Sequence, residues 1–465
     1  MTLRNRKAYE LNMTDGPILP TLLQFTFPLM FSGILQLLFN AADIVVVGRY
    51  AGDNALAAVG SNTSLINLLI NLFMGLSVGS NILASRQYGA RDREGMEQTV
   101  HTSILLSLVS GAVLAIAGVM GARTFLTWMQ SPPEVLDLAT VYLRIFFLGM
   151  PATMLYNFGS ALLRAVGDTR RPLNYLFIAG VINVVLNLYF VIVLDMDVAG
   201  VGWATVISQC VSAFLVLRCM VKDTGWIHLD LRKLQFHKVR VKQILQTGLP
   251  AGFQGILFAM SNVIIQSQLN SFGEIVVAGN AAASNIETFV YNSMNAVYQA
   301  NMSITSANLG AGRIDRIRPV AWRSQVTVLT IGVLMGGTAA YFGPQLLHIY
   351  SDSPAVIAAG MDRMMINCLL FALCGIMDVM VGSIRGIGYS VMPMLVSLLG
   401  VCGVRLVWVY TVFQIPAYHP PRGIYWSYPL SWTFTFLVHL LCFTVALRRL
   451  RRTMRTSEPI TPEFE

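Results

Sequence analysis

The chain has 465 residues, of which 55% are hydrophobic and only 12% are charged. Soluble domains usually carry about 25% charged residues, so a soluble protein of this length would lack the charge to coat its surface. The composition therefore excludes soluble enzymes, nucleic-acid binders and disordered scaffolds. It predicts an integral membrane protein.

Twelve apolar runs follow one another along the chain, each long enough for the roughly 20 residues of helix that cross a bilayer. Their apolar residues are continuous rather than alternating, which favours an all-α protein over a membrane barrel. The first run is too long for the core of a signal peptide, so we expect a retained membrane helix. The predicted spans cover residues 22–48, 57–84, 100–121, 138–163, 173–194, 199–220, 243–271, 275–308, 322–347, 355–384, 392–416 and 425–447.

Lysine and arginine are distributed unequally between alternate loops. With the N-terminus in the cytoplasm, the cytoplasmic segments hold 26 of them and the opposite side holds four. Positive residues accumulate on the cytoplasmic side, so we expect a multi-pass protein of the plasma membrane with both termini inside. The same placement explains the net charge of +9 without a nucleic-acid partner. The four on the opposite side are Arg49, Arg123, Arg363 and Arg422, while Arg144 and Arg405 fall within spans.

An internal repeat relates the two halves of the chain. Three segments recur at an offset of 221 or 222 residues, and each half holds six predicted spans. Because six is even, the halves have the same orientation and are related by an axis along the membrane normal, an arrangement typical of alternating-access carriers. The matching segments are 27–35 with 249–257, 85–90 with 306–311, and 164–172 with 385–393. We predict an N-lobe at 1–221, a cytoplasmic linker at 222–242 and a C-lobe at 243–465.

Three carboxylates lie inside predicted spans, where they are costly and usually functional. Asp43 is in the first span, Glu287 in the eighth and Asp378 in the tenth. Each carboxylate has an alternative role in a helix–helix hydrogen bond. The cysteines and histidines show no metal-ligand spacing, so no metal site or disulfide framework is expected.

Asp43 has candidate partners in neighbouring spans, namely Asn157, Asn183 and Asn187. Asn183 and Asn187 are four residues apart and project from one helix face. A carboxylate in an apolar cavity has its charged form disfavoured, so it can load and release a proton. With amide oxygens around it, the same group can instead hold Na⁺, and the sequence leaves both ions open.

Stripes of polar side chains on several spans are candidates for the wall of a water-accessible substrate cavity, although such stripes also serve as packing contacts between helices. They occur on equivalent helices of both halves, which favours the cavity. Pro28 and Pro250 occupy matching positions in the opening helix of each half, where a proline permits a bend or a hinge. The candidate cavity residues are Gln36, Asn40, Ser64, Asn67, Asn71, Asn262, Gln266, Asn292, Asn295 and Gln299, with Asn270 and Thr288 in the same rows.

Together, Pro28 with Asp43, the Gly-Ala turns at 89–90 and 310–311, the segment 164–172 and the pair Asn183 and Asn187 resemble the multidrug and toxic compound extrusion (MATE) family, including its bacterial NorM-like and DinF-like members. The resemblance implies two six-helix lobes that form a V-shaped central cavity. It implies a monomeric antiporter in contact with membrane lipids that exports organic cations and drugs in exchange for H⁺ or Na⁺, without another cofactor.

The resemblance also implies that Asp43 is the coupling carboxylate of the N-lobe, with Asn157, Asn183 and Thr205 nearby. Members of the family often have Asp where this chain has Asn187. Asp378 resembles the C-lobe aspartate of Na⁺-coupled members. Which ion is coupled is thus left open.

Two alternatives to a drug exporter stay open from the sequence. One is a lipid-linked oligosaccharide flippase of the same superfamily, but twelve spans and only two intramembrane arginines, Arg144 and Arg405, speak against it. The other is a membrane-embedded transferase, which needs clustered aspartates at a membrane face, and none are visible. We therefore expect a transporter rather than an enzyme.

Overall fold

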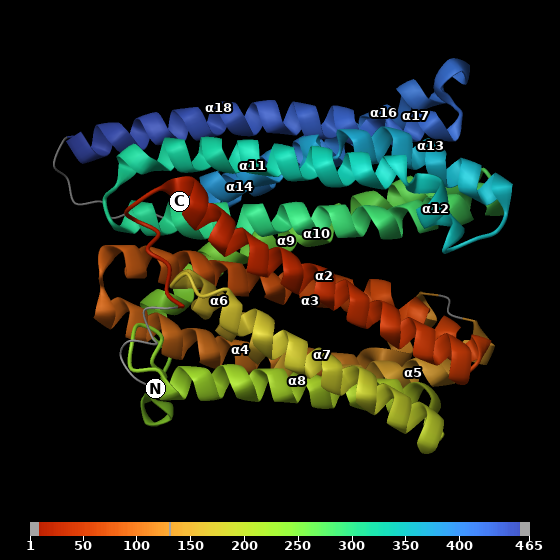
Figure 1. The fold of residues 1–465 in the computed structure, drawn as a ribbon, viewed down its shortest axis with the longest axis horizontal. Helices are drawn as coiled ribbons and strands as arrows, with labels where there is room; N and C mark the ends of the chain where they lie inside the picture. The colour runs from red at the N-terminus through yellow and green to blue at the C-terminus, as the bar shows by residue number, and fades with distance from the viewer. Residues whose placement is uncertain (1–8, 130–131, 456–465) are drawn as a thin grey trace. The chain divides into compact units, whose positions relative to one another are not determined.

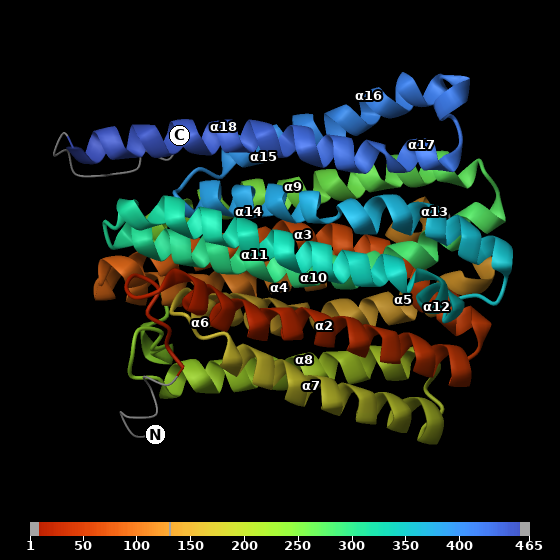
Figure 2. The same cartoon turned by 45° about the horizontal axis from the view of Figure 1, so that its top comes forward.

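The computed structural model describes residues 9–129 and 132–455, and a few side chains within these ranges, Ser64 among them, are not described. The described residues form helices joined by turns, and no strand occurs among them. Figures 1 and 2 show the long helices of each part of the chain running along a common direction.

The helical runs of the described residues coincide with the twelve predicted spans. Six of them precede residue 230: α2 (Ile18–Tyr50), α3 (Asp53–Ala90), α4 (Arg93–Trp128), α5 (Pro133–Leu148) with α6 (Met150–Ala165), α7 (Arg170–Leu188) with the π-helical turn Tyr189–Val193, and α8 (Asp197–Lys222). The others are α9 (Lys238–Asn270), α10 (Glu274–Gly310), α11 (Ile314–Tyr341), α13 (Pro354–Leu370) with α14 (Ala372–Gly386), α15 (Val391–Ser397) with the π-helical turn Leu398–Gly403 and α16 (Val404–Tyr410), and α17 (Pro421–Tyr425) with α18 (Ser427–Arg455). A short helix, α12 (Gly343–His348), follows α11.

Not every one of these runs is apolar enough to identify as a membrane span by itself. Among the described residues, seven helices meet the length and hydropathy of a span, and nine do if each bent pair, α5 with α6 and α13 with α14, counts as one. The long helices α3, α10 and α11 fall outside that set. Their polar side chains lower the hydropathy, so these helices need neighbouring helices as partners in a membrane.

The backbone repeats the internal symmetry of the sequence. Helices α5 and α6 bend by 46° and helices α13 and α14 by 45°, at positions about 222 residues apart. Turns with positive φ also recur, since Gly52 (84°) matches Gly273 (88°) and Gly167 (86°) matches Gly388 (106°), each at an offset of 221. Glycine adopts this conformation without the steric penalty of a Cβ atom.

The chain divides into two compact units whose boundaries lie inside helices. Unit 1 is Met1–Leu11 with Ile34–Gly252, and unit 2 is Asn12–Gly33 with Phe253–Glu465. Helices α2 and α9, which open the two sequence halves, therefore each contribute to both units. The lobes at 1–221 and 243–465 stay a prediction, and α9 begins at Lys238, inside the predicted linker.

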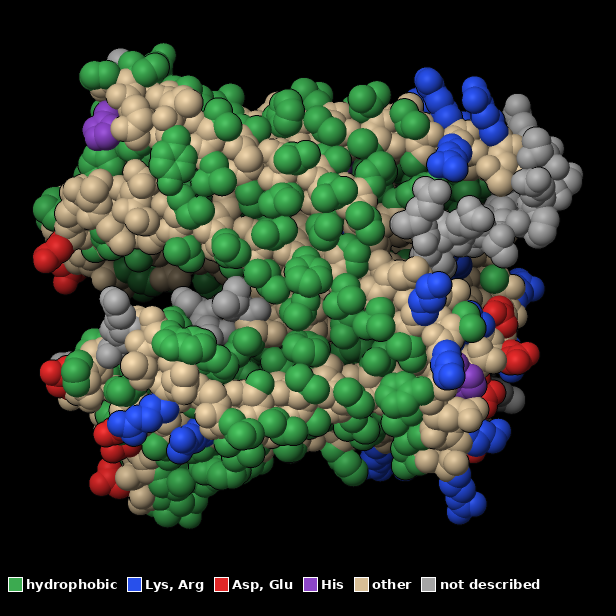
Figure 3. Space-filling model, turned by 180° about the vertical axis from the view of Figure 1, so that it is seen from behind, with side chains coloured by type: hydrophobic (Ala, Val, Ile, Leu, Met, Phe, Trp, Pro, Cys, Tyr) green, Lys and Arg blue, Asp and Glu red, His purple; other side chains and the backbone are tan. Residues whose placement is uncertain are grey.

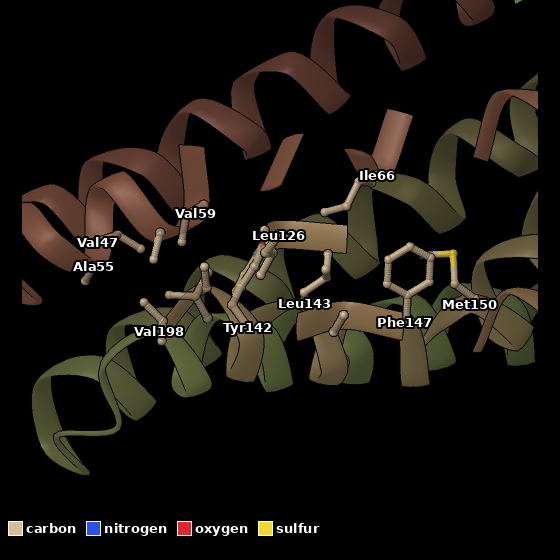
Figure 4. Packing of buried hydrophobic residues seen from close by; sticks show 14 of the residues in the cluster. Val47, Ala55, Val59, Ile66, Leu126, Tyr142, Leu143, Phe147, Met150 and Val198 are labelled. Carbon is tan, nitrogen blue, oxygen red and sulfur yellow. The ribbon is translucent and has the colours of Figure 1, made fainter. Parts of the chain in front are cut away.

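The core of unit 1 is a continuous apolar cluster. Val47, Ile66, Leu143 and Phe147 are almost fully buried in it, together with Tyr142 (Figure 4). Helices α3 and α9 approach closely at Gly75, where an added Cβ atom would lie 2.3 Å from the backbone nitrogen of Gly252. Small residues permit such close backbone packing of membrane helices, where apolar side chains gain nothing by leaving lipid.

In unit 2, the segment before α2 is tied to α10 and α11. The amide of Asn308 donates to the carbonyl of Met13 at 2.9 Å, and the guanidinium of Arg313 pairs with Asp15 at 3.0 Å. Arg316 donates to the carbonyl of Gly16 at 2.9 Å. These contacts fix the start of α2 on unit 2.

The outer surface is rich in large apolar side chains. Met120 on α4, Val263 on α9 and Trp322 on α11 are each more than 60% exposed. Figure 3 shows hydrophobic side chains over the middle of the visible face and most Lys and Arg side chains near one end. Such apolar exposure suits contact with lipid rather than water.

Candidate functional site

A chain of polar contacts in unit 1 begins at Asp43 on α2. The amide nitrogen of Asn187, on α7, donates a hydrogen bond to the Asp43 carboxylate. The same nitrogen lies 3.3 Å from Oδ1 of Asn183, one turn earlier on α7. Asn183 in turn lies 3.5 Å from the hydroxyl of Thr205 on α8. The contacts thus connect three helices through four side chains.

Asn183 and Asn187 can join this chain because of their helical spacing. Residues four apart lie on one face of a helix, and both side chains are buried where α7 packs on α8. Thr205 reaches Asn183 because its hydroxyl also donates to the carbonyl of Val201, which fixes its rotamer. The four-residue spacing of Asn183 and Asn187 therefore places both amides on the same face of α7.

The Asp43 carboxylate makes no ion pair with any residue in the described part of the chain. The hydroxyl-bearing ring of Tyr142, on α5, is its electrostatic neighbour. Oδ1 of Asn187 is buried and has no hydrogen-bond partner among the described residues. An intramembrane carboxylate with only neutral neighbours can change its protonation state without breaking a salt bridge.

Asn157, the fourth predicted partner, is not part of this chain of contacts. Its amide donates to the carbonyl of Thr153 on its own helix, at 2.8 Å. Its position corresponds to Asp378 in the second half, at an offset of 221. Asp378 lies on α14, and Tyr291 is among its electrostatic neighbours.

Glu287, on α10, has a different environment from Asp43. Its two carboxylate oxygens accept from Nε and Nη2 of Arg363, on α13, at 2.9 and 2.6 Å. Nη1 of Arg363 donates to Asn280 at 2.6 Å, and Asn280 donates to Gln266 at 2.8 Å. The pair is almost fully buried, so each charge depends on the other for compensation.

The position of Arg363 corrects a sequence prediction. The loop count placed it on the external side, whereas it lies inside α13 and is 7% exposed. Arg385, counted in a cytoplasmic loop, is likewise buried in α14, where it donates to Tyr298 and Gln254. A count of charges in loops misses such residues because only tertiary contacts show that a carboxylate neutralises Arg363 and that neutral acceptors bind Arg385. Arg363 therefore joins Arg405 as an arginine in the helical interior.

Arg405 itself has neutral partners. Its Nε donates to the hydroxyl of Ser431 at 3.1 Å and its Nη1 to Oδ1 of Asn262 at 3.3 Å. Its guanidinium lies 4.2 Å from the ring centre of Tyr428, which also faces Arg363 at 5.6 Å. The aromatic face stabilises both cations through its quadrupole.

The predicted cavity stripes differ in what they contact. On α10, Asn292 donates to the carbonyl of Thr288 and Gln299 donates to Asn295, so this row is paired along its own helix. Gln266 donates to Asn270 in the same way on α9. The side chains of Gln36, Asn40, Asn67 and Asn262 are exposed, Asn71 is half-buried, and Ser64 lies outside the described side chains.

The two prolines lie inside the long helices α2 and α9. The hydroxyl of Ser32 donates to the carbonyl of Pro28 at 2.9 Å. Among the described residues, no group of three or more His, Cys, Asp or Glu side chains is arranged to hold a metal ion.

The family model MatE matches the chain twice, at residues 28–189 and 250–411. The chain belongs to the MatE family. The two matches are displaced by 222 residues, the offset of the internal repeat. They cover the helices that carry Asp43, Asn187, Glu287 and Asp378.

Individual relatives agree with this assignment. The "Probable multidrug resistance protein YpnP" of Bacillus subtilis is 26% identical over 84% of this chain and 87% of its own length. The "Multidrug export protein MepA" of Staphylococcus aureus (strain NCTC 8325 / PS 47) is 19% identical over 96% and 97%. This member of a multidrug efflux family is thus a multi-pass membrane transporter, not an enzyme.

Solved structures show the same fold. An outward-facing multidrug resistance MATE family transporter of the MOP superfamily aligns with a TM-score of 0.87 at 22% identity, over 95% of this chain and 98% of that one. A MOP superfamily transporter from Pyrococcus furiosus, described as having a binding pocket of reverse polarity, aligns with a TM-score of 0.88 at 22% identity, over 94% and 98%. The twelve-helix arrangement of two repeated halves is that of these transporters.

Proposed function

We propose that this protein exports organic cations and drugs across the plasma membrane in exchange for protons, with Asp43 as the coupling carboxylate. The observation that carries the proposal is the Asp43 environment: a network of the buried Asn187 and Asn183 with the half-buried Thr205, and no ion-pair partner in the described chain. An organic cation and a proton can then compete for one negative charge. The relatives named as multidrug resistance and export proteins support the substrate class.

The contacts of Asp43 favour H⁺ over Na⁺. Asn187 presents its amide nitrogen to the carboxylate, a donor that suits an anion and repels a metal cation. Sodium ions prefer several oxygen ligands, and no cluster of carboxylates meets at Asp43 within the described residues. Coupling to Na⁺ is the alternative that the experiment below must exclude.

The hydrogen-bond inventory gives a mechanism for coupling. Ionised Asp43 only accepts hydrogen bonds, but a protonated carboxyl group also donates one. The unpaired Oδ1 of Asn187 is the nearest acceptor for that donor once the amide turns over. Turning this amide changes its contact with Asn183, so protonation alters the contacts between α2 and α7. Loss of the negative charge at the same time releases a bound cation.

The bias of Lys and Arg supports an orientation with both termini in the cytoplasm. Glu287 is assigned a structural role in this scheme, because Arg363 already neutralises it. Within the described residues Asp378 makes no salt bridge, although Arg385 attracts it electrostatically, and it is a second candidate for ion binding.

The test is transport of ethidium by purified protein in liposomes, driven separately by a pH gradient and by a Na⁺ gradient. We expect the pH gradient alone to drive transport in the unmodified protein and Asp43→Asn to abolish it. Asp137→Asn is the matched control, because Asp137 is an exposed carboxylate of the same unit paired only with the exposed Arg123. Full activity is expected from this control.

Three results would contradict the proposal. Transport driven only by a Na⁺ gradient would show that the coupled ion is Na⁺ rather than H⁺. Undiminished transport by Asp43→Asn would show that Asp43 is not the coupling carboxylate. No ethidium movement under either gradient would favour a lipid-linked oligosaccharide flippase, which would then be tested with lipid-linked sugars.

A further inference from the structure

A cavity of about 500 Å³ lies in unit 1 at the end of the molecule where α7 begins and α8 ends. It is separate from the Asp43 site, which is formed by the opposite ends of these two helices. The lining includes Tyr9, Arg171, Tyr175, Leu215, Arg218 and Lys222. The cavity thus combines three cationic side chains, two aromatic rings and the aliphatic side chain of Leu215.

Arg171 is held in place within this lining. Its Nε donates to the carboxylate of Asp168, which is 0% exposed, and its Nη1 lies 3.0 Å from the sulfur of Cys219. Its guanidinium lies 5.6 Å from the ring centre of Tyr9. A guanidinium fixed by a buried carboxylate is preorganised to donate its remaining N–H groups to a ligand.

Arg218 and Lys222 are the exposed cations of the lining. They are four residues apart on α8, so they lie on one face, and both are exposed. Neither makes an ion pair within the described part of the chain. Two like charges at this spacing repel each other, and an anion bound between them relieves the repulsion.

The cavity also contains acidic groups, and their contacts matter. Asp223 is 8% exposed, and its carboxylate accepts a hydrogen bond from the backbone N–H of Gly225 at 2.9 Å. Glu10 is the other acidic residue of the lining. Asp223 and Glu10 offset part of the positive charge of the lining, and the exposed Arg218 and Lys222 remain the cations that an external anion can reach.

The apolar surface beside the cavity indicates what carries that anion. Phe214 lies one turn before Arg218 on the same face of α8 and is 61% exposed. A free anion gains nothing from this ring, whereas an acyl chain packs on it while the headgroup occupies the cavity. Basic pockets between membrane helices on the cytoplasmic side are known to bind anionic lipid headgroups.

We propose that this cavity binds the phosphate headgroup of an anionic phospholipid, with its acyl chains along Phe214. The phosphate oxygens accept hydrogen bonds from Arg171, Arg218 and Lys222. The lipid then connects the ends of α7 and α8, the two helices that supply Asn187 and Thr205 to the transport site. The binding itself does not depend on which ion drives transport.

The experiment is native mass spectrometry of the detergent-solubilised full chain, titrated with phosphatidylglycerol, phosphatidylcholine or inorganic phosphate. We expect one phosphatidylglycerol to bind at least tenfold more tightly than phosphatidylcholine. The double variant Arg218→Gln with Lys222→Gln should lower phosphatidylglycerol affinity about tenfold or more, because each basic residue near a membrane surface contributes measurably to the attraction of anionic lipid. Phe214→Ser should lower it without creating phosphate binding.

The matched control is Arg448→Gln with Arg449→Gln, which removes the same charge from exposed positions at the end of α18 in unit 2. It should keep phosphatidylglycerol affinity within twofold of the unmodified protein. An equal loss in this control, or equal affinity for the two lipids, would overturn the proposal. Binding of inorganic phosphate that Arg218→Gln with Lys222→Gln abolishes and Phe214→Ser leaves intact would identify free phosphate as the ligand instead. Thermal unfolding of every variant verifies that it is folded.

Discussion

Asp43 in unit 1 and Glu287 in unit 2 have opposite electrostatic environments. Asp43 in unit 1 is surrounded by neutral hydrogen-bonding groups, whereas Glu287 in unit 2 is held by both arms of a buried guanidinium. A buried charge without a counter-charge is costly, and its ionisation is sensitive to any approaching cation. A buried ion pair is insensitive, because each partner stabilises the charge of the other.

One position in the repeat accounts for much of this difference. Pro133 and Pro354 begin equivalent helices, and at the same offset of 221 Tyr142 in unit 1 corresponds to Arg363 in unit 2. Tyr142 is the neighbour of Asp43, and Arg363 is the partner of Glu287. The two repeated halves thus differ at a position that determines whether a nearby carboxylate has a positive charge beside it.

The largest effect is expected when the cation of unit 2 is introduced at the equivalent position of unit 1. Tyr142→Arg should place a guanidinium beside Asp43, pair with it, and abolish proton-driven ethidium transport in liposomes. Tyr142→Phe is the matched control, because it keeps the ring and the burial without adding a charge, and it should retain most of the transport. Normal transport by a folded Tyr142→Arg protein would show that Asp43 works despite a counter-charge.

Removing the cation from unit 2 should destabilise the fold. Arg363→Met leaves Glu287 buried and unpaired, which typically costs about 3–5 kcal/mol, and denaturant unfolding in detergent measures the loss. Adding Glu287→Gln to this variant should recover most of the stability, because the uncompensated charge disappears. If the double variant is no more stable than Arg363→Met, the pair is not the source of the loss.

A smaller effect is expected at the far end of the Asp43 network. Thr205→Val keeps the shape of the side chain but removes the hydroxyl that lies 3.5 Å from Asn183. The free energy of unfolding should fall by about 0.5–1.5 kcal/mol, the net value of a typical hydrogen bond, with a modest change in transport rate. Thr153→Val is a suitable comparison, because its hydroxyl bonds only within its own helix. A greater loss of transport in Thr153→Val than in Thr205→Val would show that transport does not depend on the contact between Thr205 and Asn183.

Several features of the site were predictable from the sequence for specific reasons. The i, i+4 spacing of Asn183 and Asn187 and the rarity of a carboxylate in an apolar run pointed to Asp43 and its partners on α7. The contact of Thr205 came only from the family resemblance. Asn157 was predicted beside them, but its amide bonds within its own helix because a nearby backbone carbonyl is a sufficient acceptor.

Other features depended on packing between segments far apart in the chain. Arg363 is separated from Glu287 by 76 residues, and nothing local to either residue indicates that they meet. The helices α3, α10 and α11 were predicted as apolar runs, but their polar side chains keep them below the hydropathy of a span, so their place in a membrane depends on the helices packed against them.

The sequence by itself determined that this chain is a helical membrane protein with a duplicated architecture, because hydropathy, helical periodicity and a constant offset are properties of linear order. The tertiary structure decided which charges are compensated and which stay available for ions and ligands. The physical reason is that an intramembrane charge takes its properties from groups within a few ångströms, and those groups come from other helices. Asp43 and Glu287 are similar in sequence context, and they differ because one meets an amide and the other meets Arg363.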